Sequence, residues 1–253
     1  MKRGIQSLAN GLDILDILVE ADRPLGVTEL ATKLDMDKST VYRLLSTLAN
    51  RSYILQEPDT RRYQPSLKIV SHGRKIINDI QLRSVAKPFL KQLTLSTGES
   101  SNLAILAGVR VVYIDNEDSV ASLNVQAEIG QVAPPHCTAL GKALVIQYTA
   151  DELRNLYKDY ELRRFTSRTI TTIDELVAHL VTVKERGYAI DQEECYPGVS
   201  CLAAPIYDHN NKVVAATGIS GPSIRMTAER IVELAPSVIE AAREISRKLG
   251  NRS

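Results

Sequence analysis

Apolar residues recur at helical spacing along the first quarter of the chain. With acidic residues between them, they predict one amphipathic helix over residues 5–21, and a proline and a glycine then end the pattern. The apolar positions of this predicted helix are Leu8, Leu12, Leu15, Ile17, Leu18 and Val19.

Two shorter helices are predicted next, on either side of a three-residue turn. Thr28 is placed to cap a helix over residues 29–34, and Asp37 is placed to cap a third helix over residues 38–51. Asp35, inside the turn, belongs to a residue type that tolerates the left-handed backbone conformation. Two short helices joined in this way predict a helix-turn-helix.

A short β-hairpin is predicted after the third helix. Residues 53–56 and 61–64 have the composition of strands, and the Pro-Asp-Thr sequence at 58–60 favours a turn between them. The tip of this hairpin carries the paired arginines Arg61 and Arg62. Together with the three helices, it predicts a winged helix-turn-helix.

The rest of the chain mixes strands and helices. Two strand pairs are predicted, residues 102–107 with 109–115, and residues 202–207 with 213–220 around an Asn-rich turn. Helices are predicted near residues 139–148, 151–157, 173–186 and 227–249. Strand pairs combined with segregated helices predict an α+β domain with an antiparallel sheet.

A helical joint is predicted between the two parts. Residues 66–80 have a helical pattern that is expected to be broken or kinked near Gly73, and another helix follows over residues 81–97. Neither has the composition of a flexible linker. The expected organisation is therefore a winged helix-turn-helix domain over residues 1–65, a helical linker, and a larger α+β domain over residues 81–253.

Composition then limits the class of protein. The chain has 253 residues, of which 44% are apolar, and this excludes a disordered or fibrous protein. Three cysteines are too few for a disulfide scaffold and indicate a reducing compartment. No apolar run approaches the roughly 18 residues that cross a bilayer, and the start of the chain does not resemble a secretory signal. We therefore expect a cytoplasmic protein with no membrane partner.

Charge indicates a partner only locally. The whole chain has 31 basic and 30 acidic side chains, so its net charge of +1 favours no class of ligand. Residues 38–75, in contrast, hold eight basic side chains against Glu57 and Asp59 alone. Such a basic segment favours double-stranded DNA as the partner. A solvated charged face, or a protein-interaction module with the same fold, would carry the same pattern.

The residues expected to contact DNA lie mainly on the third helix and the hairpin. Val41 is expected to face the core, so that its neighbours enter the major groove first. Arg43 is placed for a bidentate contact with guanine, whereas Lys38 is placed to contact phosphate. The predicted DNA-binding residues are Thr28, Lys38, Ser39, Thr40, Tyr42, Arg43, Arg61 and Arg62.

Two segments of the larger domain contain polar residues that could bind a ligand or take part in catalysis. Thr138 and the N–H groups that follow it begin a helix, an arrangement that can hold a small carboxylate, and residues 191–201 form a charged loop. An enzyme would need a nucleophile and a base, but His136 and Cys137 are adjacent and point in different directions. The cysteines lack the spacing of a zinc site. We therefore expect no catalytic residue, metal or cofactor. The alternative function is that of an enzyme that acts on a small acid and carries an appended helix-turn-helix.

These fragments, in this order, resemble the IclR-type family of bacterial transcription regulators over nearly the whole chain. The matching segments are Thr28-Glu29-Leu30-Ala31, Lys38-Ser39-Thr40-Val41-Tyr42-Arg43-Leu44-Leu45, Thr138-Ala139-Leu140-Gly141-Lys142, Asp191 with Glu193-Glu194, Pro197-Gly198-Val199, Cys201 and Ala203-Ala204-Pro205. Each fragment is weak alone, and their order makes the match specific. The resemblance implies a winged helix-turn-helix joined by a helix to a GAF-like effector-binding domain, in a dimer or a tetramer.

The resemblance also implies an effector site and a function. Gly218 stands where some relatives have a serine, so the polar contacts to a ligand are expected to differ here. The function implied is a transcriptional regulator, a repressor rather than an activator, whose binding to operator DNA is modulated by a small organic acid. The implied effector-binding residues are Ala139, Leu140, Gly141, Asp191, Cys201 and Ser220.

Overall fold

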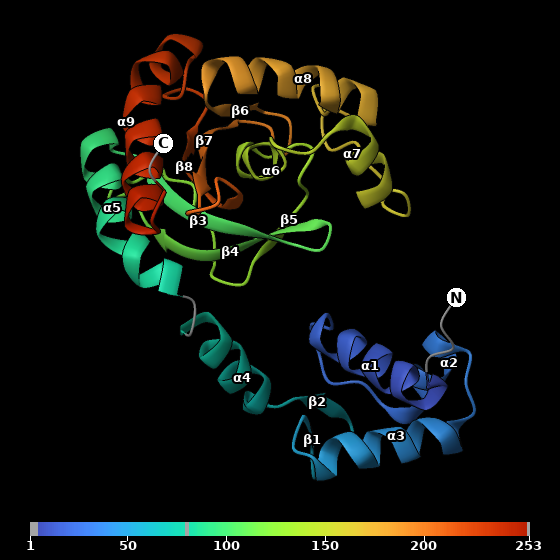
Figure 1. Cartoon of the computed structure of the whole chain (residues 1–253). Helices are drawn as coiled ribbons and strands as arrows, with labels where there is room; N and C mark the ends of the chain where they lie inside the picture. The colour runs from blue at the N-terminus through green and yellow to red at the C-terminus, as the bar shows by residue number, and fades with distance from the viewer. Residues whose placement is uncertain (1–4, 79–80, 252–253) are drawn as a thin grey trace. The chain divides into compact units, whose positions relative to one another are not determined.

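The computed structural model describes residues 5–78 and 81–251, and the chain divides into two compact units on either side of residues 79–80 (Figure 1). The predicted linker over residues 66–80 therefore ends outside the described residues. Within the described parts of the chain, no helix is both long and apolar enough to span a bilayer.

The first unit is a winged helix-turn-helix, as predicted. Its hairpin pairs two short antiparallel strands, and its core is formed by buried aliphatic residues from all three N-terminal helices, among them Ile14, Leu30 and Leu45. The elements are α1 (Gln6–Val19), α2 (Val27–Leu34), α3 (Lys38–Asn50), β1 (Ile54–Gln56), β2 (Tyr63–Pro65) and α4 (Leu67–Asn78).

The turn between α2 and α3 follows the prediction in its backbone. Asp35 has the left-handed conformation, with φ of 50° and ψ of 50°, and Asp37 is the N-cap of α3. The prediction that Thr28 caps α2 is wrong, because the helix begins two residues earlier than predicted, at Val27, with Gly26 as its N-cap. The carboxylate of Glu29 supplies the capping acceptor, since the N–H of Gly26 donates to its Oε2 over 2.8 Å.

Two predictions about helices of the first unit need correction. The apolar residues of α1 lie on two faces, because Ile14 and Leu18 enter the core whereas Leu8 and Leu12 are exposed. In addition, α4 runs through Gly73 without the predicted break.

The second unit is an α+β domain built on one antiparallel sheet, which confirms the predicted fold class. The six strands lie in the order β5-β4-β3-β8-β7-β6. Its elements are α5 (Gln81–Thr97), β3 (Ser100–Ala107), β4 (Arg110–Glu117), β5 (Val132–Ala133), α6 (Ala139–Leu144), α7 (Ala150–Leu156), α8 (Ile173–Arg186), β6 (Ala189–Gln192), β7 (Val199–Tyr207), β8 (Val213–Pro222) and α9 (Ala228–Lys248).

Helices cover both faces of this sheet (Figure 1). Alternate residues of each strand point to opposite faces, so Leu202 packs with α5 and α9 while its neighbour Ala203 packs with α6, α7 and α8. The sheet is therefore the middle layer of three, and α6 lies against the face that carries Cys201 and Ala203.

Some local predictions in this unit were wrong. Residues 189–192, expected to lie partly in a charged loop, form the edge strand β6, in which Asp191 pairs with Cys201 of β7. The helix that begins at Ala139 ends at Leu144, four residues before the predicted end. The two-residue strand β5 was not predicted.

Candidate functional site

The outward face of α3 has the polarity expected of a DNA-reading helix. Val41 is fully buried and anchors α3 in the core, whereas its sequence neighbours are exposed. Lys38 and Arg43 form no ion pair with any residue of the described ranges, so their charges are available to a partner. The exposed predicted residues are Thr28, Lys38, Ser39, Thr40, Tyr42 and Arg43.

The two arginines of the wing differ in their surroundings. Arg61 is exposed, has a positive φ of 56° and forms no ion pair with the residues that the structure covers. Arg62 instead turns back to the start of α2, where it donates to Glu29 Oε2 over 2.7 Å and to the Pro24 carbonyl over 3.1 Å. Glu29 also accepts a hydrogen bond from Arg23, which, together with the hydrogen bond from the Gly26 N–H, lowers the pKa of Glu29 to about 2. Arg62 thus connects the hairpin to the start of α2, whereas Arg61 has no acidic partner among the described residues.

A small cavity of about 60 Å³ lies in the second unit, between the sheet and the start of α6. It has room for several water molecules or for one small organic molecule. Five of the six predicted effector residues line it, namely Ala139, Leu140, Asp191, Cys201 and Ser220. No lysine or arginine stands among its lining residues. An anion in this cavity would therefore rely on uncharged hydrogen-bond donors.

Gly141, the sixth predicted effector residue, does not line the cavity. A Cβ on this glycine would lie 2.3 Å from the Pro135 carbonyl oxygen, so glycine is needed for the close packing of α6 against that backbone. Its N–H donates to the Thr138 hydroxyl over 3.2 Å, and that hydroxyl donates to the Pro134 carbonyl over 2.7 Å. The Gly141 N–H is therefore satisfied by Thr138, whereas the expectation that Thr138 and the N–H groups of Ala139 and Leu140, which line the cavity, hold an anion stays a prediction.

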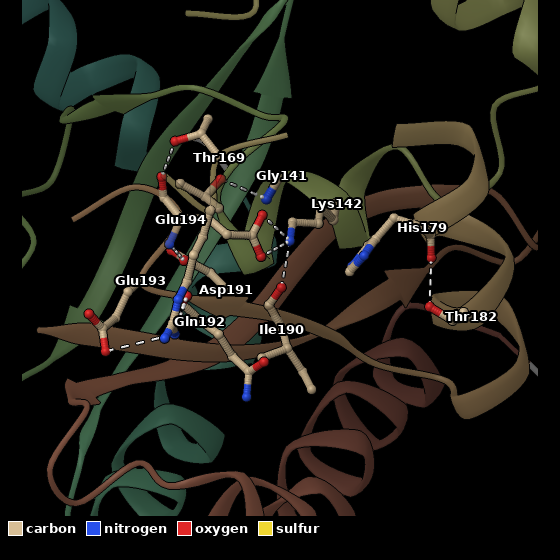
Figure 2. Close-up of polar contacts among 12 residues, drawn as sticks. Gly141, Lys142, Thr169, His179, Thr182, Ile190, Asp191, Gln192, Glu193 and Glu194 are labelled. Atoms are coloured by element: carbon tan, nitrogen blue, oxygen red, sulfur yellow. Dashed lines mark hydrogen bonds and ion pairs between the residues drawn. The ribbon is translucent and has the colours of Figure 1, made fainter. Parts of the chain in front are cut away.

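A buried charge cluster fixes the position of Asp191 (Figure 2). The side chain of Lys142, on α6, is fully buried, and its Nζ donates to both carboxylate oxygens of Glu194, over 2.5 and 2.7 Å, and to the Ile190 carbonyl over 2.6 Å. The N–H of Glu194 in turn donates to Asp191 Oδ1 over 2.7 Å. Lys142 therefore holds both sides of the turn that carries Asp191 into the cavity.

The protonation of these acids follows from their burial. Removal from water raises the pKa of Asp191 to about 7, although the hydrogen bond from the Glu194 N–H acts in the opposite direction. Burial also raises the pKa of Glu194, against the effect of Lys142. Asp191 is thus half protonated near neutral pH and can donate a hydrogen bond in its acid form.

The floor of the cavity carries one hydroxyl from β8. Ser220 accepts a hydrogen bond from Asn102 Nδ2 over 3.2 Å and also bonds to Cys201. Gly218, on the same face, cannot be a serine, since a Cβ there would lie 2.3 Å from the Leu202 carbonyl oxygen. The departure from the family pattern at residue 218 therefore has a steric reason.

The residues that an enzyme would need are otherwise engaged. His136 is buried with its Nε2 3.0 Å from the Arg163 carbonyl oxygen. Cys137 and Cys195 are free thiols in hydrogen-bonding contact, and this contact together with burial raises the pKa of Cys137, which disfavours its thiolate.

Sequence reasoning missed several lining residues. Tyr113 comes from β4, and four residues come from the irregular segment between β4 and β5, for which neither spacing nor residue type gave a signal. Cys195 and Tyr196 were recognised only as part of a charged loop. The missed residues from the segment are Val125, Gln126, Ala127 and Gln131.

Comparison with known proteins places both units in one family. The model described as "IclR helix-turn-helix domain" matches residues 7–58, and the one described as "Bacterial transcriptional regulator IclR C-terminal" matches residues 74–247. The chain is 37% identical to the HTH-type transcriptional regulator BhcR of Paracoccus denitrificans, over 96% of this chain and 87% of that protein. It is 34% identical to the HTH-type transcriptional repressor AllR of Salmonella typhimurium, over 98% and 92%. The crystal structure of Thermotoga maritima IclR superposes with a TM-score of 0.74 at 33% identity, covering 98% of this chain and all of that one.

Proposed function

The chain belongs to the IclR family of bacterial transcriptional regulators. On that premise we propose that it is a cytoplasmic repressor. In this proposal a small organic acid, bound in the second unit, modulates the affinity of the chain for operator DNA. One relative of similar length, AllR, is itself named a repressor. In this proposal α3 reads base edges, Arg61 contacts phosphate, and two copies of the chain bind one operator.

The DNA-binding role is supported mainly by the exposed face of α3, on which Lys38 and Arg43 have no acidic partner among the described residues. A buried Val41 fixes the rotation of the helix, so Thr40 and Arg43 face outward together, one turn apart. Arginine at such a position makes two parallel hydrogen bonds to guanine, which carry sequence information. A purely structural arginine would have an acidic partner, as Arg62 has in Glu29.

Arg43→Ala is expected to weaken binding to the specific duplex by about 1–3 kcal/mol and to leave binding to random DNA nearly unchanged, because it removes a base contact. The specific duplex is the one that the parent chain enriches from a randomised library. Binding is measured by fluorescence anisotropy at several salt concentrations.

Arg61→Ala is the matched control for this experiment. It removes a phosphate contact, so it should weaken both duplexes alike and reduce the slope of log affinity against log salt by about 1. Equal losses on both duplexes for Arg43→Ala would contradict its base-reading role. If the parent chain enriches no duplex at all, the proposed function itself is wrong.

The cavity of the second unit supports the effector part of the proposal. Its polar groups are hydroxyl, thiol, amide and carboxyl groups, and Asp191 can be neutral near pH 7, so a small carboxylate meets donors and no fixed negative charge. A cavity of about 60 Å³ favours a compact acid over an extended one.

A panel of small keto, hydroxy and sugar acids is expected to contain a compound that raises the melting temperature of the chain. A ligand at about 100 times its dissociation constant adds about 2.7 kcal/mol to stability. Ser220→Ala removes a hydroxyl on the cavity floor and should lower the affinity for that compound by about fivefold, since one hydrogen bond contributes about 1 kcal/mol. An unchanged affinity would place the compound outside the cavity.

A further inference from the structure

Asn102, on β3, carries a buried polar side chain next to the cavity of the second unit. This side chain is 1% exposed, and its Nδ2 donates to the Ser220 hydroxyl over 3.2 Å. Its Oδ1 has no hydrogen-bond partner among the described residues. Buried polar atoms are nearly always paired, and a buried acceptor without a partner lowers the stability of a fold. Stability alone therefore does not explain an asparagine at this position.

The register of the sheet brings Asn102 to the face that carries the cavity. The next residue, Leu103, packs on the opposite face with α5 and α9, and Asn102 stands directly across from Gly218 of β8. Gly218 has no side chain, so the amide of Asn102 reaches past it to Ser220, which is two residues further along β8 and lies on the same face. Asn102 thus contacts the cavity floor from the neighbouring strand.

The hydrogen bond from Asn102 defines the role of the Ser220 hydroxyl. A serine oxygen that accepts one hydrogen bond keeps its own proton to donate. The Ser220 hydroxyl also bonds to the thiol of Cys201, and both residues line the cavity. Sulfur is a weak acceptor, so an oxygen atom of a ligand on the cavity floor is the better partner for the Ser220 proton.

We propose that Asn102 is a positioning residue of the effector site, which holds the Ser220 hydroxyl as a hydrogen-bond donor toward an oxygen acceptor of the ligand, a carboxylate or a carbonyl oxygen. This inference rests on the proposed function, because it names the group that the effector presents to the cavity floor. Asn102 is not among the residues that line the cavity, so it acts on the ligand through Ser220. The arrangement favours a carboxylate over an amine of the same size.

A double-mutant cycle tests whether Asn102 acts through the serine. Asn102→Ala and Ser220→Ala are each expected to lower the affinity of the full chain for acetate about fivefold, and the double variant about fivefold rather than about 25-fold. Acetate is the probe, because a carboxylate with a single methyl group suits a cavity of about 60 Å³. Binding is measured by ¹H–¹⁵N NMR titration, with sodium chloride replacing sodium acetate in the reference titration.

Thr217→Val is the matched control for the Asn102 variant. Thr217 comes directly before Gly218 on β8, is fully buried and donates to the Asn102 carbonyl over 3.0 Å. It is not a lining residue of the cavity. Valine keeps the shape of threonine and removes one buried hydrogen bond, so the affinity for acetate should stay that of the parent chain. Circular dichroism verifies the fold of each variant.

The parent chain provides a second measurement, which remains valid if Asn102→Ala does not fold. The side-chain amide signals of Asn102 are identified by their absence from the spectrum of Asn102→Asp, a substitution that keeps the shape of the side chain. These signals should shift as acetate saturates the parent chain, because the Ser220 oxygen that accepts from Asn102 gains a new partner for its own proton.

The possible failures of this inference and of the proposed function differ. An unchanged affinity of Asn102→Ala, additive losses in the double variant, or amide signals that do not move with acetate would overturn the inference and leave the proposed effector site standing. If acetate does not bind but another acid of the panel does, that acid replaces acetate in the cycle and the same outcomes decide. If no acid binds the parent chain, the effector part of the proposed function is wrong and the inference is wrong with it.

Discussion

Lys142→Met is expected to lower the free energy of unfolding of the second unit by about 3–5 kcal/mol, because it leaves the buried Glu194 carboxylate without its cation. The ammonium group makes three hydrogen bonds, two to Glu194 and one to the Ile190 carbonyl, and all three acceptors lose their donor together. Methionine fills nearly the same volume, so the loss reports on charge and hydrogen bonding rather than on a cavity. Urea unfolding followed by far-UV circular dichroism measures it, since the chain has no tryptophan.

A double-mutant cycle measures the interaction energy between Lys142 and Glu194 separately from their contacts with other residues. Lys142→Met with Glu194→Leu removes both charges, and the double variant should recover much of the stability that Lys142→Met loses. Because burial already raises the pKa of Glu194, the unpaired acid of Lys142→Met can neutralise itself by taking up a proton. The loss should therefore be smaller at pH 5 than at pH 8. Strictly additive losses, or a loss independent of pH, would show that the two side chains are not coupled.

The architecture of both units was predictable because it depends on local signals. Spacing of apolar residues located α2 and α3, and the turn residue Asp35 adopts the conformation that its type tolerates. The strand pairs followed from alternation and from their Gly and Asn turns, whose Gly108 and Asn211 both have positive φ. Such signals lie within a few residues of one another, so one sequence is sufficient to recognise them.

Long-range partners were not predictable in the same way. Arg62 was expected to contact phosphate, but its acidic partner Glu29 lies 33 residues earlier in the chain. Lys142 was recognised only as part of a matching family segment, and its partner Glu194 lies 52 residues away. The periodicity of α1 predicted a helix but not which of its two apolar faces enters the core, since that choice depends on where α2 and α3 pack.

The residues that line the cavity could be predicted only in part. The family resemblance placed five lining residues correctly, yet it assigned Gly141 to the ligand although steric contact with Pro135 explains that glycine. The irregular segment that contributes Gln126 has no periodicity, so no residue pattern could assign it to the cavity. Segments of this kind require the three-dimensional structure.

Asp191→Asn is expected to make the chain more stable than the parent at pH 8 and about equally stable near pH 4. Burial raises the pKa of Asp191 from its ordinary value near 4 to about 7 in the folded chain. The folded state therefore keeps a proton that the unfolded state releases, and stability falls as pH rises between these values, by at most about 1.4 kcal/mol per pH unit from this group. Asparagine resembles the neutral acid and keeps an oxygen for the Glu194 N–H.

The measurement is the difference in unfolding free energy between parent and variant from pH 4 to pH 8. That difference should grow with pH across the window and level off above pH 7, because both states of the parent are then ionised. Glu194 titrates in both chains, so its contribution cancels to first order. A constant difference would mean that Asp191 is ionised throughout and that its carboxylate is stabilised by contacts other than those described.

The raised pKa of Asp191 gives the proposed binding of a small acid a testable pH dependence. A bound carboxylate beside Asp191 favours its protonated form, so binding takes up a proton above pH 7 and the affinity should fall by up to tenfold per pH unit. Asp191→Asn should bind the same acid with an affinity that hardly changes between pH 6 and pH 8. Isothermal titration calorimetry in two buffers of different ionisation enthalpy counts the protons directly. Uptake in the parent but not in the variant assigns the proton to Asp191, whereas equal uptake in both would assign it to another group.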